Sequence, residues 1–181
     1  MRTAVLAAVH RIPEFILSAI VLVLFGISPL HAGEVSVDDV KARMTGLYIL
    51  EEWHKDGEVL RPPQAQGRFI LLNGVIMTIL DNKMQPSSRA TTVLVGKYEL
   101  TSEKFSYGYD DVSIFTEEAD STKVSHKPLW EGMRGFIPSI EGDRLRLRQE
   151  NGMRELLFTS EGLDYSENGK LLRKWRRTTN N

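Results

Sequence analysis

Few side chains in this 181-residue sequence have the types and spacing that catalysis or metal binding requires. The sequence contains no cysteine, so thiol chemistry and disulfide bonds are excluded. It also lacks the Gly-x-Ser-x-Gly motif of hydrolases and the glycine-rich phosphate-binding loop. His54 and His126 are far apart, and neither has a second histidine at the spacing of a zinc site. The sequence therefore predicts no catalytic residue, no metal site and no cofactor.

Arginine and tyrosine side chains are better candidates, provided that the fold turns them into a common interior. A guanidinium binds a carboxylate through two parallel hydrogen bonds, and a phenol adds one donor. Together they would hold the charged end of an amphipathic ligand in an apolar cavity. The residues predicted to contact such a ligand are Tyr98, Tyr107, Tyr109, Arg134, Arg154, Phe69 and Leu71. Two simpler alternatives are that the arginines reach solvent at the rim of the fold and that the tyrosines only pack in its core.

The apolar wall of this interior is predicted from the stretch GRFILLNGVIMTIL, residues 67–80. Asn73-Gly74 indicates the tight turn of a β-hairpin, because a type I′ turn needs positive φ at both positions. Alternation then places Phe69 and Leu71 on one face of the hairpin and Leu72 on the other, and both faces are apolar. One face should line a core, and the other should be covered by a helix, a loop or a second copy of the chain.

A second hairpin predicts where the tyrosines point. A four-residue loop at 101–104 pairs Tyr98 with Tyr107 on the neighbouring strand. Alternation puts Tyr109 on the same face, whereas Glu99 and other polar residues point the opposite way. This pattern predicts an aromatic interior.

A third hairpin predicts where the arginines point. A turn at Asn151-Gly152 pairs Arg148 with Glu155, so that opposite charges face each other on the outer surface. Extending the same pairing turns Arg134 and Arg154 inward, because successive side chains of a strand alternate between its faces.

These hairpins belong to a chain that is almost entirely predicted as strands. Ser36 and Gly46 bound one short helix at 37–45. Further strands are predicted at 48–54, 112–116 and 171–177, for a total of about nine. Nearly every connection joins neighbouring strands, which predicts an all-β fold, an antiparallel up-and-down barrel of about 8–10 strands. The formal net charge of −1 is too balanced to indicate a nucleic-acid partner.

The N-terminal residues are predicted to be removed before the barrel folds. Residues 15–30 are almost wholly apolar, follow a basic start and precede the small residue Ala32, which is typical of a secretory signal peptide. We therefore predict a signal peptide at 1–32, cleaved after Ala32, and a barrel domain at 33–181. The mature protein should lie in the periplasm or outside the cell, with no membrane span after cleavage. An uncleaved membrane anchor is the alternative, although the uninterrupted apolar core is shorter than the roughly 20 residues that a spanning helix needs.

The order of several short motifs resembles the bacterial lipocalin-like domains of the calycin superfamily. A short helix is followed by GLYILEEW, and the chain ends in LRKWRR; between them lie GRFILLNG, GKYEL, WEGMRGF and GDRLRL. The resemblance covers residues 44–177. It implies that Gly46-Leu47-Tyr48 takes the place of the Gly-x-Trp of the first strand, and that an arginine within 173–177 packs on Tyr48. It also implies a barrel in which the first strand pairs with the last, near Trp175.

These features together predict an exported protein that binds a small hydrophobic or amphipathic molecule inside its barrel. Two alternatives remain open: a barrel enzyme of the isomerase, cyclase or hydrolase type acting on a small apolar substrate, and a structural barrel with a filled interior. An open interior lined by apolar and tyrosine side chains would favour binding. A buried histidine or carboxylate facing it would favour chemistry.

Overall fold

The computed structural model describes residues 35–85, 88–118, 120–127 and 132–178, which belong to one compact unit, Glu34–Asn181. The predicted signal peptide and its cleavage site lie outside these residues. The elements are α1 (Val37–Met44), β1 (Gly46–Lys55), β2 (Glu58–Leu60), β3 (Ala65–Leu72), β4 (Val75–Gln85), β5 (Ser88–Leu100), β6 (Phe105–Glu118), β7 (Ser121–His126), β8 (Arg134–Glu141), β9 (Arg144–Gln149), β10 (Arg154–Phe158), β11 (Gly162–Glu167) and β12 (Lys170–Arg177).

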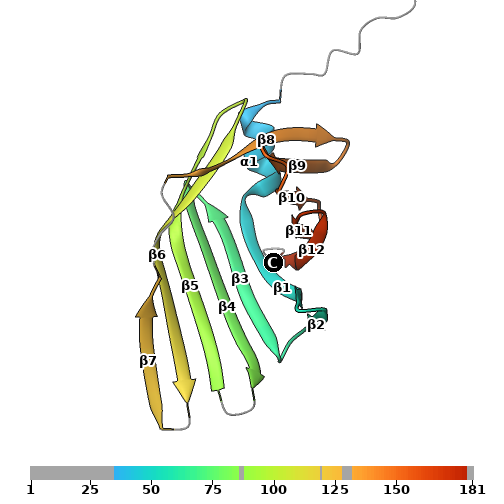
Figure 1. The fold of residues 1–181 in the computed structure, drawn as a ribbon. Coiled ribbons are helices and arrows are strands. Elements are labelled where there is room, and N and C mark those ends of the chain that lie inside the picture. Colours follow the sequence, from blue (N-terminus) through green and yellow to red (C-terminus); the bar gives the residue numbers. More distant parts are fainter. Residues whose placement is uncertain (1–34, 86–87, 119, 128–131, 179–181) are drawn as a thin grey trace, which may run out of the picture. The chain divides into compact units, whose positions relative to one another are not determined.

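Ten antiparallel strands close into a barrel, as the sequence predicts. Consecutive strands are neighbours around the wall, and β1 pairs with β12 to close it, with Leu50 opposite Trp175 (Figure 1). Two short strands lie outside the ring: β2 pairs with β1, and β7 pairs with β6. The predicted pairing of the first strand with the last is therefore confirmed.

The short-range turn signals predicted the strand registers correctly. Asn73 and Gly74 have φ of 50° and 82°, as a type I′ turn requires. Phe69 and Leu71 point inward and are buried, whereas Leu72 on the alternate face is 50% exposed. The predicted pairs Tyr98–Tyr107 and Arg148–Glu155 are also present.

One predicted division of the chain is wrong. The segment 112–116 is not a separate strand, because it continues from Tyr107 and Tyr109 in the 14-residue strand β6. A bulge makes this continuity possible: Gly96 pairs with Tyr109 and Val95 with Asp111, so the intervening aspartate has no partner in the ladder. Gly96 is required at this bulge, because a Cβ there would overlap the carbonyl oxygen of Gly108.

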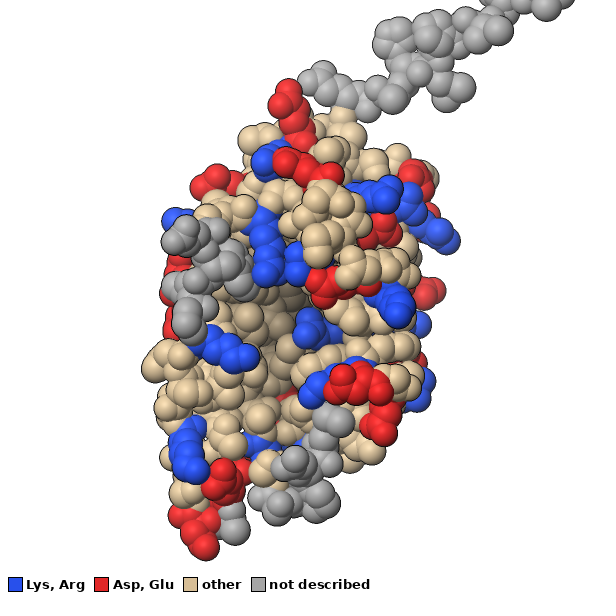
Figure 2. Space-filling view, in the orientation of Figure 1, with Lys and Arg blue, Asp and Glu red and all other residues tan. Residues whose placement is uncertain are grey.

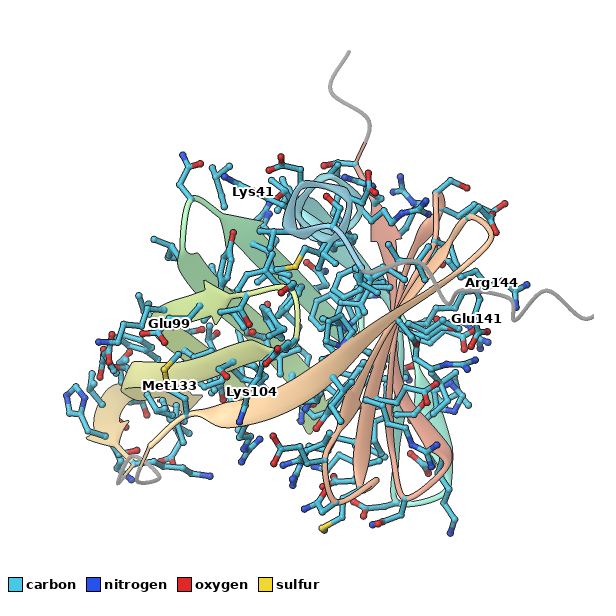
Figure 3. The ribbon with its side chains drawn as sticks, turned by 90° about the horizontal axis from the view of Figure 1, so that it is seen from above. Lys41, Glu99, Lys104, Met133, Glu141 and Arg144 are labelled. Carbon is cyan, nitrogen blue, oxygen red and sulfur yellow. The ribbon has the colours of Figure 1, made fainter. Side chains whose placement is uncertain are left out.

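Helix α1 and the last residue of β12 close one end of the barrel. The helix buries Val40 and Met44 in the main core, and the Tyr48 hydroxyl donates a hydrogen bond to the Met44 carbonyl at 2.8 Å. Arg177 packs over the Tyr48 ring at 5.9 Å and donates to the carbonyls of Arg43 and Thr45. Its positive charge lies at the C-terminal end of the helix, where the helix dipole favours a cation. Figure 3 looks down on this end, with Lys41 on the helix.

The outer apolar face of the β3–β4 hairpin is not covered by the helix. Leu72 and Val75 are 50% and 44% exposed, and neither α1 nor a loop of the described residues buries them. The sequence analysis expected a helix, a loop or a second copy of the chain to bury this face. The second copy remains a prediction.

Candidate functional site

The interior of the barrel contains a cavity of about 290 Å³ that opens to the surface. Strands of the first half of the chain and strands of the second half both contribute residues to it. Figure 2 shows a hollow in the surface, with Lys and Arg side chains beside it. Its lining comprises Phe69, Leu71, Ile76, Thr78, Leu80, Leu94, Phe105, Tyr107, Tyr109, Arg134, Arg154, Leu156, Phe158, Leu163, Tyr165, Glu167, Leu172, Arg173 and Trp175. No residue of α1 is among them, so the cavity lies beyond the packed core at the helix end.

The predicted ligand residues converge on this cavity with one exception. The six that line it are Phe69, Leu71, Tyr107, Tyr109, Arg134 and Arg154. Tyr98 points inward and is buried, but it packs against Phe105 at 5.7 Å and does not line the cavity. It belongs to the same face as Tyr107, and the neighbouring core separates it from the open space.

The charge of Arg154 is balanced within the protein. Its guanidinium forms an ion pair with Glu167 at 2.5 Å and donates to the Gln149 side chain at 3.2 Å. The sequence did not predict Glu167 as a wall residue, because the register of the last hairpin was left open. The turn at Asn168-Gly169 decides it: Glu167 pairs with Lys170, and its side chain turns inward beside Arg154.

Arg173 is a third arginine of the cavity, and it differs from Arg154 in having no carboxylate partner. Its guanidinium lies 5.2 Å from the Trp53 ring and 5.7 Å from the Tyr165 ring. Its Nε is buried, and no described group accepts a hydrogen bond from it. Burial lowers the pKa of the Arg173 guanidinium, yet arginine ionises so far above neutral pH that the side chain keeps its charge.

Sequence reasoning placed Arg173 only within the range of the closing arginine. The signal that could have found it is its spacing from Trp175, since residues two apart on a strand share a face. Arg177, on that same face, closes the helix end, whereas Arg173 lies further along β12 and lines the cavity.

Tyr107 and Tyr109 bring neutral hydroxyl groups to the wall. Tyr107 stacks on Phe136 at 5.6 Å, and the Tyr109 hydroxyl lies 2.9 Å from Thr78 Oγ1. Burial raises the pKa of both phenols above the ordinary value, and nearby Arg134 offsets part of this rise for Tyr107. Both tyrosines therefore remain hydrogen-bond donors at neutral pH.

A grouping of Ser113, His126 and Asp111 on β6 and β7 has the residue types of a hydrolase triad but not its geometry. The Ser113 hydroxyl lies 3.2 Å from His126 Nδ1, and the Asp111 carboxylate lies 3.4 Å from the same nitrogen. A triad needs the serine on one ring nitrogen and the carboxylate on the other. His126 is also largely exposed and is not among the residues that line the cavity.

His54 is likewise no candidate for catalysis in the cavity. It lies 2.9 Å from Glu52, which also binds Arg61, and none of the three lines the cavity.

Within the described part of the chain, no group of three or more His, Asp or Glu side chains could hold a metal ion. The described residues also contain no helix that is long and apolar enough to cross a membrane.

The cavity is electropositive. The charged side chains among its described lining residues are three arginines and one glutamate, for a net charge of +2. The remaining wall is aromatic, aliphatic or hydroxyl-bearing.

Compared with protein families, with curated proteins and with solved structures, the chain matches none of them.

Proposed function

We propose that this protein is a lipocalin-like barrel that binds a small hydrophobic or amphipathic molecule in its interior. The observation that carries the proposal is the cavity of about 290 Å³, lined mainly by aliphatic and aromatic side chains with a few polar groups at defined positions. Binding sites for small molecules have this composition, and their volumes begin at roughly 300 Å³. A structural barrel would fill this space with side chains.

The closing arginine supports the lipocalin-like assignment. Arg177 on the last strand lies over Tyr48 of the first strand, where the resemblance placed a cation on an aromatic ring. The barrel is compatible with the lipocalin-like fold. Because one fold hosts many functions, the proposed activity depends on the cavity and not on this likeness.

The enzyme alternative is weaker. Glu167 is a carboxylate on the cavity wall, which by itself would favour chemistry, but it is ion-paired with Arg154. No described histidine lines the cavity.

The volume limits the size of the ligand. At about 30 Å³ for each water molecule, the cavity has room for about ten waters, and a medium-chain molecule with around ten carbons is of this order. Burying a ten-carbon chain contributes about 8 kcal/mol at roughly 0.8 kcal/mol per methylene, before the costs of ordering. We therefore expect micromolar or weaker affinity.

Filling the cavity should abolish binding. Leu156→Trp adds an indole to the cavity wall, so decan-1-ol, a neutral ligand, should bind to the wild type but not to this variant in isothermal titration calorimetry. Leu157→Trp is the matched control, because Leu157 is the next residue on β10 and is absent from the cavity lining. It should bind decan-1-ol as the wild type does. Equal binding by Leu156→Trp would place the ligand elsewhere, and a wild type that binds nothing would refute the proposal.

Native mass spectrometry of protein from its own host would identify a co-purified ligand.

We also propose that the protein is exported, on the apolar segment at 15–30 that precedes Ala32. The mature chain should begin at Gly33, because the small residue at position 32 fits the site at which signal peptidase cleaves. Intact-mass measurement of protein from the periplasm or the medium checks this expectation. Full-length precursor in the inner-membrane fraction would contradict it.

A further inference from the structure

The described lining of the cavity carries a net charge of +2, and its three arginines differ in their partners. Arg154 has Glu167 and Gln149 as partners, and a hydrogen bond links Arg134 to Tyr107. Arg173 has neither an ion pair nor a hydrogen bond among the described residues. This difference between three arginines of one cavity indicates different roles.

The surroundings of Arg173 hold its guanidinium in place without using its hydrogen bonds. Trp53 and Tyr165 contact it through their rings, which attract a cation. A guanidinium has five N–H donors. The aromatic rings attract its charge but do not supply the oxygen acceptors that these donors bind. The Nε of Arg173 is buried without an acceptor, which is unfavourable, so a ligand oxygen that accepts its hydrogen bond gains affinity from a guanidinium that is already positioned.

We propose that the ligand is an amphipathic monoanion whose carboxylate pairs with Arg173. This inference rests on the proposed function, since it assigns the polar group of the molecule that the cavity binds. A planar guanidinium binds a carboxylate through two parallel hydrogen bonds. The net charge of +2 on the lining favours an anion over a cation, and the aliphatic wall, which includes Leu80, Leu94 and Leu163, accommodates its apolar body.

The sequence predicted Arg134 and Arg154 as the arginines that contact the ligand. Arg134 and Arg154 both line the cavity, but Arg154 is neutralised by Glu167. Arg173 is therefore the arginine assigned to the ligand carboxylate, because Arg134 is hydrogen-bonded to Tyr107 and Arg154 is ion-paired with Glu167.

Calorimetry with decanoate and decan-1-ol tests this role. Arg173→Gln should weaken decanoate by about tenfold to 100-fold, the usual value of hydrogen bonds to a charged group, and should leave decan-1-ol within about twofold. Lys174→Gln is the matched control, since it removes the same charge from the next residue of β12, whose side chain is exposed. It should leave both ligands unchanged.

The outcomes separate this inference from the proposed function. If the wild type binds decan-1-ol and Arg173→Gln binds decanoate as tightly as the wild type, the role of Arg173 is wrong and the binding function stands. If Lys174→Gln loses as much decanoate affinity as Arg173→Gln does, the loss reflects the net charge of the protein, and the specific pairing with Arg173 is overturned. A wild type that binds neither molecule would overturn both proposals.

A second measurement needs no variant and covers the case in which Arg173→Gln does not fold. Decanoate labelled with ¹³C at its carboxyl carbon, bound to the wild type, should titrate at lower pH than free decanoate in NMR spectra. The reason is that a neighbouring guanidinium stabilises the ionised carboxylate. Titration at the same or higher pH than free decanoate would refute the contact.

Discussion

Replacing Trp175 with alanine should lower the free energy of unfolding by about 3–5 kcal/mol, the usual cost of truncating a buried aromatic residue. Trp175 is only 3% exposed, and its ring packs 5.8 Å from the ring of Phe69. It also pairs with Leu50 across the β1–β12 seam, so its removal leaves a cavity where the barrel closes. Urea unfolding followed by circular dichroism gives the difference.

The control for this variant is Lys174→Ala on the same strand. Lys174 is exposed on the outer face, and substitutions of such residues usually change stability by less than about 0.5 kcal/mol. A loss below about 1 kcal/mol in Trp175→Ala would mean that the indole contributes little to barrel closure, since values that small are typical of sites that do not form a core.

Raising the pH from 10 to 12 should destabilise the protein by about 2 kcal/mol through Tyr48 alone, at about 1.4 kcal/mol per pKa unit and with each ionisation half complete at its own pKa. Burial raises the pKa of Tyr48 from 10.0 to about 12, and nearby Arg177 only partly offsets this effect. The folded state holds its proton more tightly than the unfolded state does. The stabilisation is therefore complete below pH 10 and is lost as the pH rises through about 12.

Urea unfolding at a series of pH values from 9 to 12 measures this linkage. The Tyr48→Phe variant lacks the ionisable group, so its stability should fall less steeply over this range. It should also be less stable at neutral pH by about 1 kcal/mol, because the hydrogen bond to the Met44 carbonyl is lost. Burial raises the pKa of Tyr107 and Tyr109 in the same direction, so a smaller dependence on pH should remain in the variant. A wild-type stability that does not change between pH 10 and 12 would contradict the burial of ionisable phenols.

The sequence by itself determined the local pairing of this protein. Asn73-Gly74 specified both a turn and the register of the strands that it joins, and the loop at 101–104 did the same for Tyr98 and Tyr107. Such pairings depend on residues close together in the chain. The backbone conformation of a short loop and a side-chain period of two are enough to predict which residues share a face.

Only the tertiary structure decided which side chains meet across the interior. The bulge at Gly96 made one strand of two predicted segments, and the last turn brought Glu167 to Arg154. With Arg154 paired to Glu167, Arg173 was left as a cavity arginine with no ion pair or hydrogen bond among the described residues. These contacts depend on bulges and on ring closure, because a shift of one residue in register moves a side chain to the opposite face of the wall. The hydrophobic pattern predicted which strand faces point into the barrel, whereas closure of the barrel placed Arg173 on the wall of the cavity.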